Sequence, residues 1–229
     1  MSSRYARALV LTLAAAAAAG TGAATAAPAE AAAPRVQAMV VGKSGWTVGP
    51  RTVAVGGVRV NSCRLRAGLP IGVLGALRQP FRARGGCSAL YVSQVRGDRE
   101  ARGAGWVYKV GNVAPSRSAS DPTGRLRSGQ KVLWFWCKRS GACNRTLATR
   151  ARVSGPRMRV TVTAYDDYGR GRRVAAATVI VRELGSSTRR TFRTANDGTV
   201  LVPVRRGKLY RVDSRRGGVV RGFPATVRA

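Results

Sequence analysis

Residues 105–137, GWVYKVGNVAPSRSASDPTGRLRSGQKVLWFWC, contain three of the four tryptophans of the chain. Aromatic and aliphatic side chains recur at every second position along residues 106–111, which is typical of a half-buried strand. Residues 112–124 are rich in Ser, Pro, Asp and Gly and are predicted to form a loop. Residues 131–136 form a nearly continuous apolar run, as in a strand that is buried on both faces. The stretch therefore predicts two strands joined by a long loop.

The same stretch resembles a known family. It is similar to the small domain at the C-terminal end of transcobalamin and intrinsic factor, which also occurs singly in many secreted bacterial proteins. The matching residues are Gly105, Trp106, Tyr108, Val110, Leu126, Gly129, Val132 and Trp134. The chain departs from the family pattern at Gly111-Asn112, where Asn-Gly is usual, and at Gln130, where Asp is usual. The resemblance covers residues 52–146 and implies an α+β β-grasp fold, but its motifs imply little about function.

In a β-grasp fold a helix crosses the sheet, and residues 70–79 are the segment that fits this helix. Pro70 suits a first helical turn, and one face of the helix would carry Leu69, Ile71, Val73, Leu74 and Leu77. Gly72 and Gly75 disfavour a helix here, since each makes helix formation about 1 kcal/mol less favourable than alanine would. We assign residues 36–153 to this predicted β-grasp domain.

A second domain is expected after a boundary at Ser154-Gly155-Pro156. Residues 158–165 alternate cleanly, and about six short strands separated by turn signals follow, which suggests an all-β sandwich over residues 156–229. This part resembles bacterial immunoglobulin-like or carboxypeptidase-regulatory-like modules. The residues that carry this resemblance are Asp167, Gly169, Val174, Asn196, Asp197, Gly198 and Val200. The resemblance implies an immunoglobulin-like fold and no particular function.

The N-terminal residues predict export. Two arginines precede an apolar run from Ala8 to Ala19, and small residues follow, as in a secretory signal peptide. The run is shorter than the about 20 residues needed to span a bilayer, and no second apolar span follows, so no transmembrane segment is predicted. We assign residues 1–27 to the signal peptide and residues 28–35 to a linker. The small-residue tail leaves the cleavage site open.

Cysteine usage agrees with a secreted, extracellular protein. The chain has four cysteines, and an even number in an exported protein suggests two disulfides. Cys137 and Cys143 flank a five-residue turn and are expected to pair, which leaves Cys63 to pair with Cys87. A zinc site is disfavoured because no C-x-x-C pair is present.

The chain is strongly basic, with 41 Lys and Arg against 9 Asp and Glu and a formal net charge of +32. Such a surface attracts polyanions without a specific site, through counterion release. The partners expected on this basis are anionic cell-wall polymers, anionic lipid headgroups or extracellular nucleic acid. A second explanation is a compositional bias spread over a solvated surface, and the sequence leaves both open.

Catalytic signatures are missing. The chain contains no histidine, which excludes a Ser-His-Asp triad and His-ligated zinc. Asp98 and Glu100 are two residues apart in an arginine-rich loop and are expected to form surface ion pairs. Asp166 and Asp167 could contribute to a calcium site, but an Asx turn is favoured because calcium needs six to eight oxygens. We therefore expect no enzyme activity, no cofactor and no metal.

The aromatic side chains provide the candidate ligand surface. Alternation places Trp134 and Trp136 on one face and Phe135 on the other, and Trp106 and Tyr108 lie on the neighbouring predicted strand. These aromatics either fill the core or form an exposed platform for a sugar ring or a flat ligand. Cobalamin binding is not transferred from the family, because transcobalamin uses a large helical domain for which this chain has no room.

Together these features predict a secreted, non-enzymatic binding or adhesion module at the bacterial cell envelope that contacts anionic polymers. The alternative is a protein that binds a small molecule, of corrinoid type or a sugar, through Trp106, Tyr108, Trp134 and Trp136.

Overall fold

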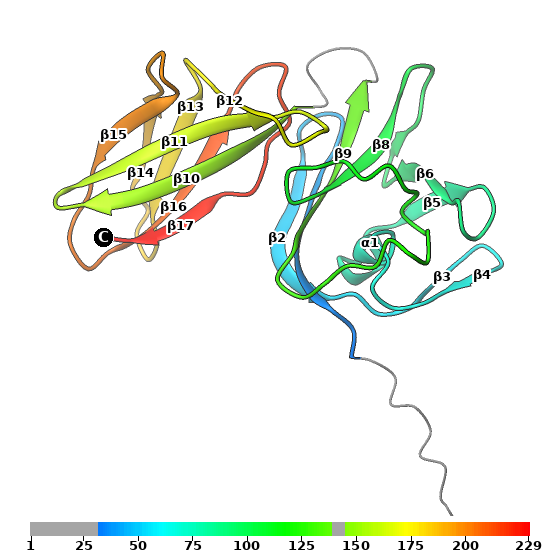
Figure 1. Cartoon of the computed structure of the whole chain (residues 1–229). Coiled ribbons are helices and arrows are strands. Elements are labelled where there is room, and N and C mark those ends of the chain that lie inside the picture. The colour runs from blue at the N-terminus through cyan, green and yellow to red at the C-terminus, as the bar shows by residue number, and fades with distance from the viewer. Residues whose placement is uncertain (1–31, 139–144) are drawn as a thin grey trace, which may run out of the picture. The chain divides into compact units, whose positions relative to one another are not determined.

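The computed structural model describes residues 32–138 and 145–229. The predicted signal peptide, most of the predicted linker and Cys143 lie outside the described residues. Figure 1 shows an N-terminal region, which we define as residues 33–138, and a C-terminal region of residues 145–229. No helix in the described ranges is long and apolar enough to cross a membrane.

The N-terminal region is built on one four-stranded sheet in the order β2-β1-β9-β8. Its strands are β1 (Arg35–Val41), β2 (Thr47–Ala54), β8 (Ala104–Val110) and β9 (Lys131–Lys138). The two strands of the aromatic stretch, β8 and β9, pair antiparallel, and β1 joins β9 in parallel. The predicted strand, loop and strand are confirmed.

Short elements pack on one face of this sheet. They are β3 (Val58–Val60), β4 (Cys63–Leu65), α1 (Gly72–Ala76), β5 (Phe81–Arg84), β6 (Tyr91–Val95) and β7 (Asp98–Arg99). The pairs β3–β4 and β5–β6 are antiparallel, and β7 pairs with β6. Together they close a core that contains Trp106, Trp134 and Trp136.

The predicted α+β β-grasp fold is wrong. The described residues are nearly all β, with 52% strand and 3% helix. The helix expected over residues 70–79 is the five-residue α1, which is little more than one turn and too short to cross the sheet. Gly72 lies in this turn, where an added Cβ would come within 3.1 Å of Val55 Cγ1. Gly72 therefore allows a close approach to Val55 and Gly56, and the segment does not form a long helix.

The C-terminal region consists of two sheets. One contains β10 (Thr146–Ser154), β11 (Arg157–Tyr165), β12 (Gly171–Arg173) and β15 (Thr199–Pro203), and β11 pairs with the other three strands. The other has the order β14-β13-β16-β17 and contains β13 (Thr178–Glu183), β14 (Arg189–Arg193), β16 (Leu209–Arg215) and β17 (Ala225–Arg228). In Figure 1 the β10–β11 hairpin crosses in front of the second sheet.

The two sheets share one core, which includes Met158, Val160 and Val162 from β11 and Val179, Val181 and Val212 from the opposing sheet. This arrangement agrees with an all-β sandwich. Of residues 154–156, predicted as a domain boundary, Ser154 ends β10, and Gly155 and Pro156 form the turn to β11. The first domain predicted from the sequence, residues 36–153, includes nearly all of β10. In the structure β10 pairs with β11 of the C-terminal region.

Candidate functional site

Strand β11 alternates between the core and the surface over its whole length. Met158 and Val160 are fully buried, so the side chains between and beyond them point to the outer face of the sheet. The outward positions of β11 carry Arg157, Arg159, Thr161, Thr163 and Tyr165. This strand therefore presents a polar and basic row to solvent.

The strand register brings further arginines to the same face. Arg152 of β10 lies opposite Arg159, and Arg150 lies opposite Thr161. On the other side of β11, Arg173 of β12 lies opposite Thr163 and Thr199 of β15 lies opposite Thr161. These side chains line an open hollow of about 550 Å³, formed by Arg150, Arg152, Arg159, Thr161, Thr163, Tyr165, Gly171, Arg173 and Thr199. We call this set of residues the arginine face.

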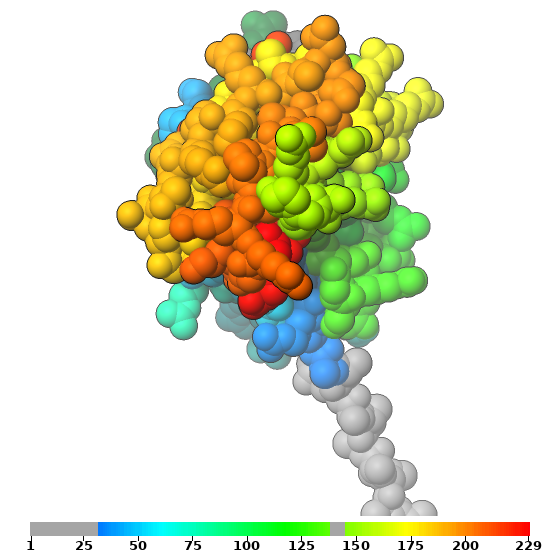
Figure 2. All heavy atoms as spheres, turned by 90° about the vertical axis from the view of Figure 1, so that its left-hand side faces the viewer, coloured from blue at the N-terminus to red at the C-terminus, as the bar shows by residue number. Residues whose placement is uncertain are grey.

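Figure 2 shows that the side chains of residues near 150, in light green, stand out from the surface of the C-terminal region. Within residues 32–138 and 145–229, no ion pair involves Arg150, Arg152, Arg159 or Arg173. Directly opposed like charges such as Arg152 and Arg159 destabilise a sheet. The face thus holds positive charge without a counterion from the described part of the chain.

One acid, Asp197, is near enough to Arg159 to feel its charge. Its carboxylate is already engaged: Thr199 Oγ1 donates to Asp197 Oδ2 at 2.7 Å and the Thr199 N–H donates to Oδ1 at 2.9 Å. These bonds from Thr199, more than the charge of Arg159, hold the pKa of Asp197 below its ordinary value. Asp197 therefore orders the edge of the arginine face without forming an ion pair on it.

The outer face of the opposing sheet also carries arginines, but it has an acid among them. Asp213 lies 3.3 Å from Arg211 Nε and 3.7 Å from Arg221. The buried Glu183 accepts from Arg205 at 3.0 Å. Acids of the C-terminal region thus neutralise part of the charge on this second sheet, whereas the described residues supply no such pair to the arginine face.

The predicted aromatic ligand surface lies in the core. Trp106, Tyr108, Trp134 and Trp136 are 5%, 8%, 1% and 8% exposed. Tyr108 stacks on Trp134 with ring centroids 5.1 Å apart, and Trp106 meets Trp136 edge-on at 5.9 Å. The predicted alternation is confirmed, since Phe135 belongs to a different cluster from Trp134 and Trp136. The rings do not form an exposed platform.

Part of this aromatic cluster still lines a small pocket. Trp106, Tyr108 and Trp134 line a hollow of about 240 Å³ together with Leu90, Tyr91, Val92, Val107, Ala114, Pro115, Arg117, Ser118 and Ala119. Tyr108 Oη donates to the Arg117 carbonyl at 3.0 Å. Burial, and secondly the charge of Asp121, raise the pKa of Tyr108 to about 12. Tyr108 is therefore a neutral donor at physiological pH.

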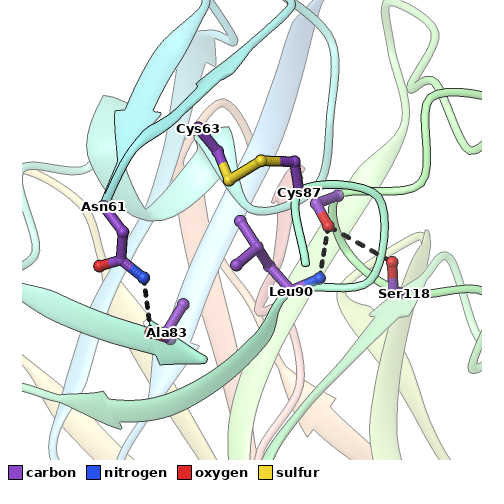
Figure 3. The surroundings of a disulfide bond; sticks show 7 residues. Asn61, Cys63, Ala83, Cys87, Leu90 and Ser118 are labelled. Atoms are coloured by element: carbon purple, nitrogen blue, oxygen red, sulfur yellow. Dashed lines mark hydrogen bonds between the residues drawn. A yellow bond between two sulfur atoms is a disulfide. The ribbon is translucent and has the colours of Figure 1, made fainter. Parts of the chain in front are cut away.

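The predicted disulfide between Cys63 and Cys87 is confirmed, with the two Cα atoms 5.4 Å apart. Figure 3 shows the bond beside Leu90, whose N–H donates to Ser120 Oγ at 2.8 Å. In the same view Asn61 donates to the Ala83 carbonyl at 3.0 Å. The disulfide thus joins β4 to the loop before β6. Cys137 is also disulfide-bonded, and the predicted pairing with Cys143 lies outside the described residues.

The acidic pairs have structural partners. Asp98 Oδ2 accepts from Trp46 Nε1 at 2.9 Å, and Glu100 pairs with Arg84 at 3.1 Å. Asp166 Oδ1 accepts the backbone N–H groups of Tyr168 and Arg170, so the expected Asx turn is confirmed. No group of three or more metal-binding side chains occurs among the described residues.

The arginine face was not among the sites predicted from the sequence. Arg150 and Arg152 belong to a segment for which no strand was predicted, and each arginine resembles the many others in the chain. The only signal in the sequence was the strict alternation of β11. This alternation puts Arg157 and Arg159 on the outer face of the strand and Met158 and Val160 on its buried face. No protein-family model matches this chain, and no curated protein sequence matches it significantly.

Proposed function

We propose that this protein is a secreted, non-enzymatic module that binds anionic polymers of the bacterial cell envelope through the arginine face. The observation that carries the proposal is the set of four arginines on one sheet face without an acidic partner among the described residues. Arginine binds phosphate and carboxylate groups with two parallel hydrogen bonds. A bound polymer would also relieve the repulsion between Arg152 and Arg159.

Two further features support this function. Thr161 and Thr163 add hydroxyl groups between the arginines, and hydroxyls can donate to the same anionic oxygens. The net charge of +32 raises the rate at which an anionic polymer meets the protein. Export is supported by the signal-peptide pattern and by the Cys63–Cys87 disulfide, which is typical of oxidising compartments.

The test measures binding to purified cell-wall sacculi, with and without their anionic polymers, over a series of salt concentrations. The site variant is R150Q/R152Q/R159Q/R173Q. The control variant R182Q/R189Q/R193Q/R215Q removes the same charge from exposed arginines associated with the opposing sheet. Removal of one arginine that binds a phosphate lowers the slope of log affinity against log salt by about 1, so we expect a decrease of about 3 to 4 in the site variant.

In the control variant we expect a much smaller change in the slope, because its arginines lie outside the proposed site. Equal losses in the two variants would mean that total charge, and not the arginine face, determines binding. Binding to stripped sacculi that resists salt would also contradict the proposal, because it requires a site that does not depend on anions.

A second candidate function is supported by the pocket beside Trp106, Tyr108 and Trp134. Its volume of about 240 Å³ is below the about 300 to 1,000 Å³ of pockets that hold drug-sized ligands. It therefore suits a single sugar better than a corrinoid. Titration of the native protein with monosaccharides, followed by tryptophan fluorescence, tests this function, and an unchanged spectrum would leave the arginine face as the candidate site.

A further inference from the structure

The loop between β11 and β12 lies at one end of the arginine face and carries an exposed tyrosine, Tyr168. The hairpin is closed by the pair Tyr165 and Gly171, and both of these residues line the hollow of that face. Tyr168 lies in the middle of the loop and is 81% exposed, the largest value among the exposed large hydrophobic residues described. A bulky ring in this position is unusual, since tyrosine normally buries much of its surface.

The backbone that carries Tyr168 is held in place by many hydrogen bonds. Asp166 Oδ1 accepts the N–H of Tyr168 at 3.0 Å and that of Arg170 at 2.8 Å. The Asp166 N–H donates to the Arg170 carbonyl at 3.1 Å. The charge-assisted bonds to this carboxylate, foremost that from Arg170, lower the pKa of Asp166, so it remains an acceptor well below neutral pH. The loop is therefore ordered around a single carboxylate.

The N-terminal region provides a second anchor for the same loop. The Ala114 N–H donates to the Asp167 carbonyl at 2.9 Å. The buried Lys109 donates to the carbonyls of Tyr165 and Asp166 at 3.1 and 2.9 Å. A loop fixed on both sides that leaves its largest side chain exposed has the character of a preorganised recognition element.

The surroundings of Tyr168 indicate the kind of group that it would contact. The Arg170 guanidinium lies 5.7 Å from the centre of the Tyr168 ring. Val113, 46% exposed, forms a backbone bridge with Tyr168 and adds apolar surface. The ring, the aliphatic side chain and the cation together suit a ligand unit that has both a flat apolar face and a negative charge.

We infer that Tyr168 is a stacking residue of the arginine face and that the polymer bound there is an anionic polysaccharide, with a sugar ring on Tyr168 and its anionic groups on the arginines. This inference rests on the proposed function. Thr161 and Thr163 in the hollow suit a ligand rich in hydroxyl groups. A face for single-stranded nucleic acid would instead need several aromatic side chains for successive bases, and Tyr165 is half-buried and packs against Gly171.

The test compares three probes: heparin, which has sulfated sugar rings; inorganic polyphosphate, which has no rings; and a single-stranded DNA oligonucleotide. Affinities are measured at moderate salt for the native protein, Y168A and Y168F. The control L184A removes another exposed large hydrophobic side chain, which directly follows β13. We expect Y168A to weaken heparin binding about fivefold, the loss expected for one stacking contact, with polyphosphate binding unchanged. Y168F and L184A should bind heparin like the native protein.

The outcomes separate the inference from the function on which it rests. If Y168A binds heparin like the native protein while R150Q/R152Q/R159Q/R173Q does not, the stacking role is wrong and the arginine face remains. If Y168A loses more affinity for DNA than for heparin, the assignment of a polysaccharide is overturned. If the native protein binds none of the three probes, the proposed function itself fails.

Discussion

Arg152 and Arg159 show at the scale of single residues how a binding face can reduce stability. They lie opposite each other on β10 and β11, where like charges are destabilising. The same kind of pairing occurs on the opposing sheet, where Arg182 lies opposite Arg189. At the arginine face, a bound anionic ligand would relieve the repulsion between Arg152 and Arg159.

A single substitution tests this cost. We expect R152T to raise the free energy of unfolding by about 0.2 to 1 kcal/mol at low salt while weakening polymer binding. This gain in the free energy of unfolding should be smaller in 1 M salt, because the Debye length there is only about 3 Å and the repulsion between the arginines is screened. Denaturant unfolding at the two salt concentrations provides the measurement.

The matched control for this experiment is R157T on the same strand. Arg157 faces outward but lies opposite Ser154 and Pro203, neither of which is charged. We expect no comparable gain in R157T. A similar gain in both variants would point to the strand propensity of threonine rather than to relief of repulsion.

At the scale of elements, the strands could largely be predicted from the sequence and the helix could not. The alternation over residues 158–165 corresponds to β11 (Arg157–Tyr165), and the apolar run 131–136 to β9 (Lys131–Lys138). Periodicity worked there because each strand has one or two buried faces. Around Gly72 the apolar spacing suggested a longer helix, but the spacing arises because the segment is packed from several sides.

Gly72 and Gly75 of α1 provide a test of this explanation. A Cβ on Gly72 would lie 3.1 Å from Val55 Cγ1 and 3.2 Å from the Gly56 carbonyl oxygen, whereas on Gly75 the nearest atom is Val58 Cγ2 at 3.4 Å. We expect G75A to raise the free energy of unfolding by up to about 1 kcal/mol, the difference in helix propensity. We expect G72A to lower the free energy of unfolding. Thermal unfolding of both variants is the measurement. Equal effects of the two substitutions on the free energy of unfolding would mean that contacts with Val55 and Gly56 do not limit the residues that α1 accepts.

The arginine face is an element-scale feature that no local pattern predicts. Arg150 and Arg173 are 23 positions apart in the sequence and are brought to one face only because β10 and β12 both pair with β11. The composition indicates positive charge and a polyanionic partner, but not the place where the partner would bind. The ligand surface was predicted on the tryptophans because aromatic residues suit both a core and a binding site.

At the scale of the whole described structure, the two regions have separate cores and a small shared cluster. Met39, Leu133 and Phe135 of the N-terminal sheet pack with Val220 of the C-terminal region. Beside this cluster, the fully buried Lys109 lies 3.1 Å from Asp167 Oδ1. A buried lysine is costly unless it is paired and hydrogen-bonded, so this residue couples the stability of β8 to that of the Tyr168 loop.

Replacement of this lysine should therefore affect both regions. In K109M the packing volume is kept, but Asp167 and the carbonyls of Tyr165 and Asp166 lose a donor. We expect a decrease of about 3 kcal/mol in the free energy of unfolding, measured by denaturant unfolding. The double variant K109M/D167N should cost less than the sum of the single variants. Strict additivity of the two substitutions would contradict a direct interaction between Lys109 and Asp167.

The contribution of Lys109 should also depend on pH. Burial lowers the pKa of Lys109 below the ordinary 10.5, against the opposing effect of Asp167. The unfolded chain then holds this proton more tightly than the folded protein does. The stability of the native protein relative to K109M should therefore rise as the pH increases towards 10.5. Denaturant unfolding of both proteins over this pH range is the measurement. A pH-independent difference would mean that Lys109 couples the regions by packing alone.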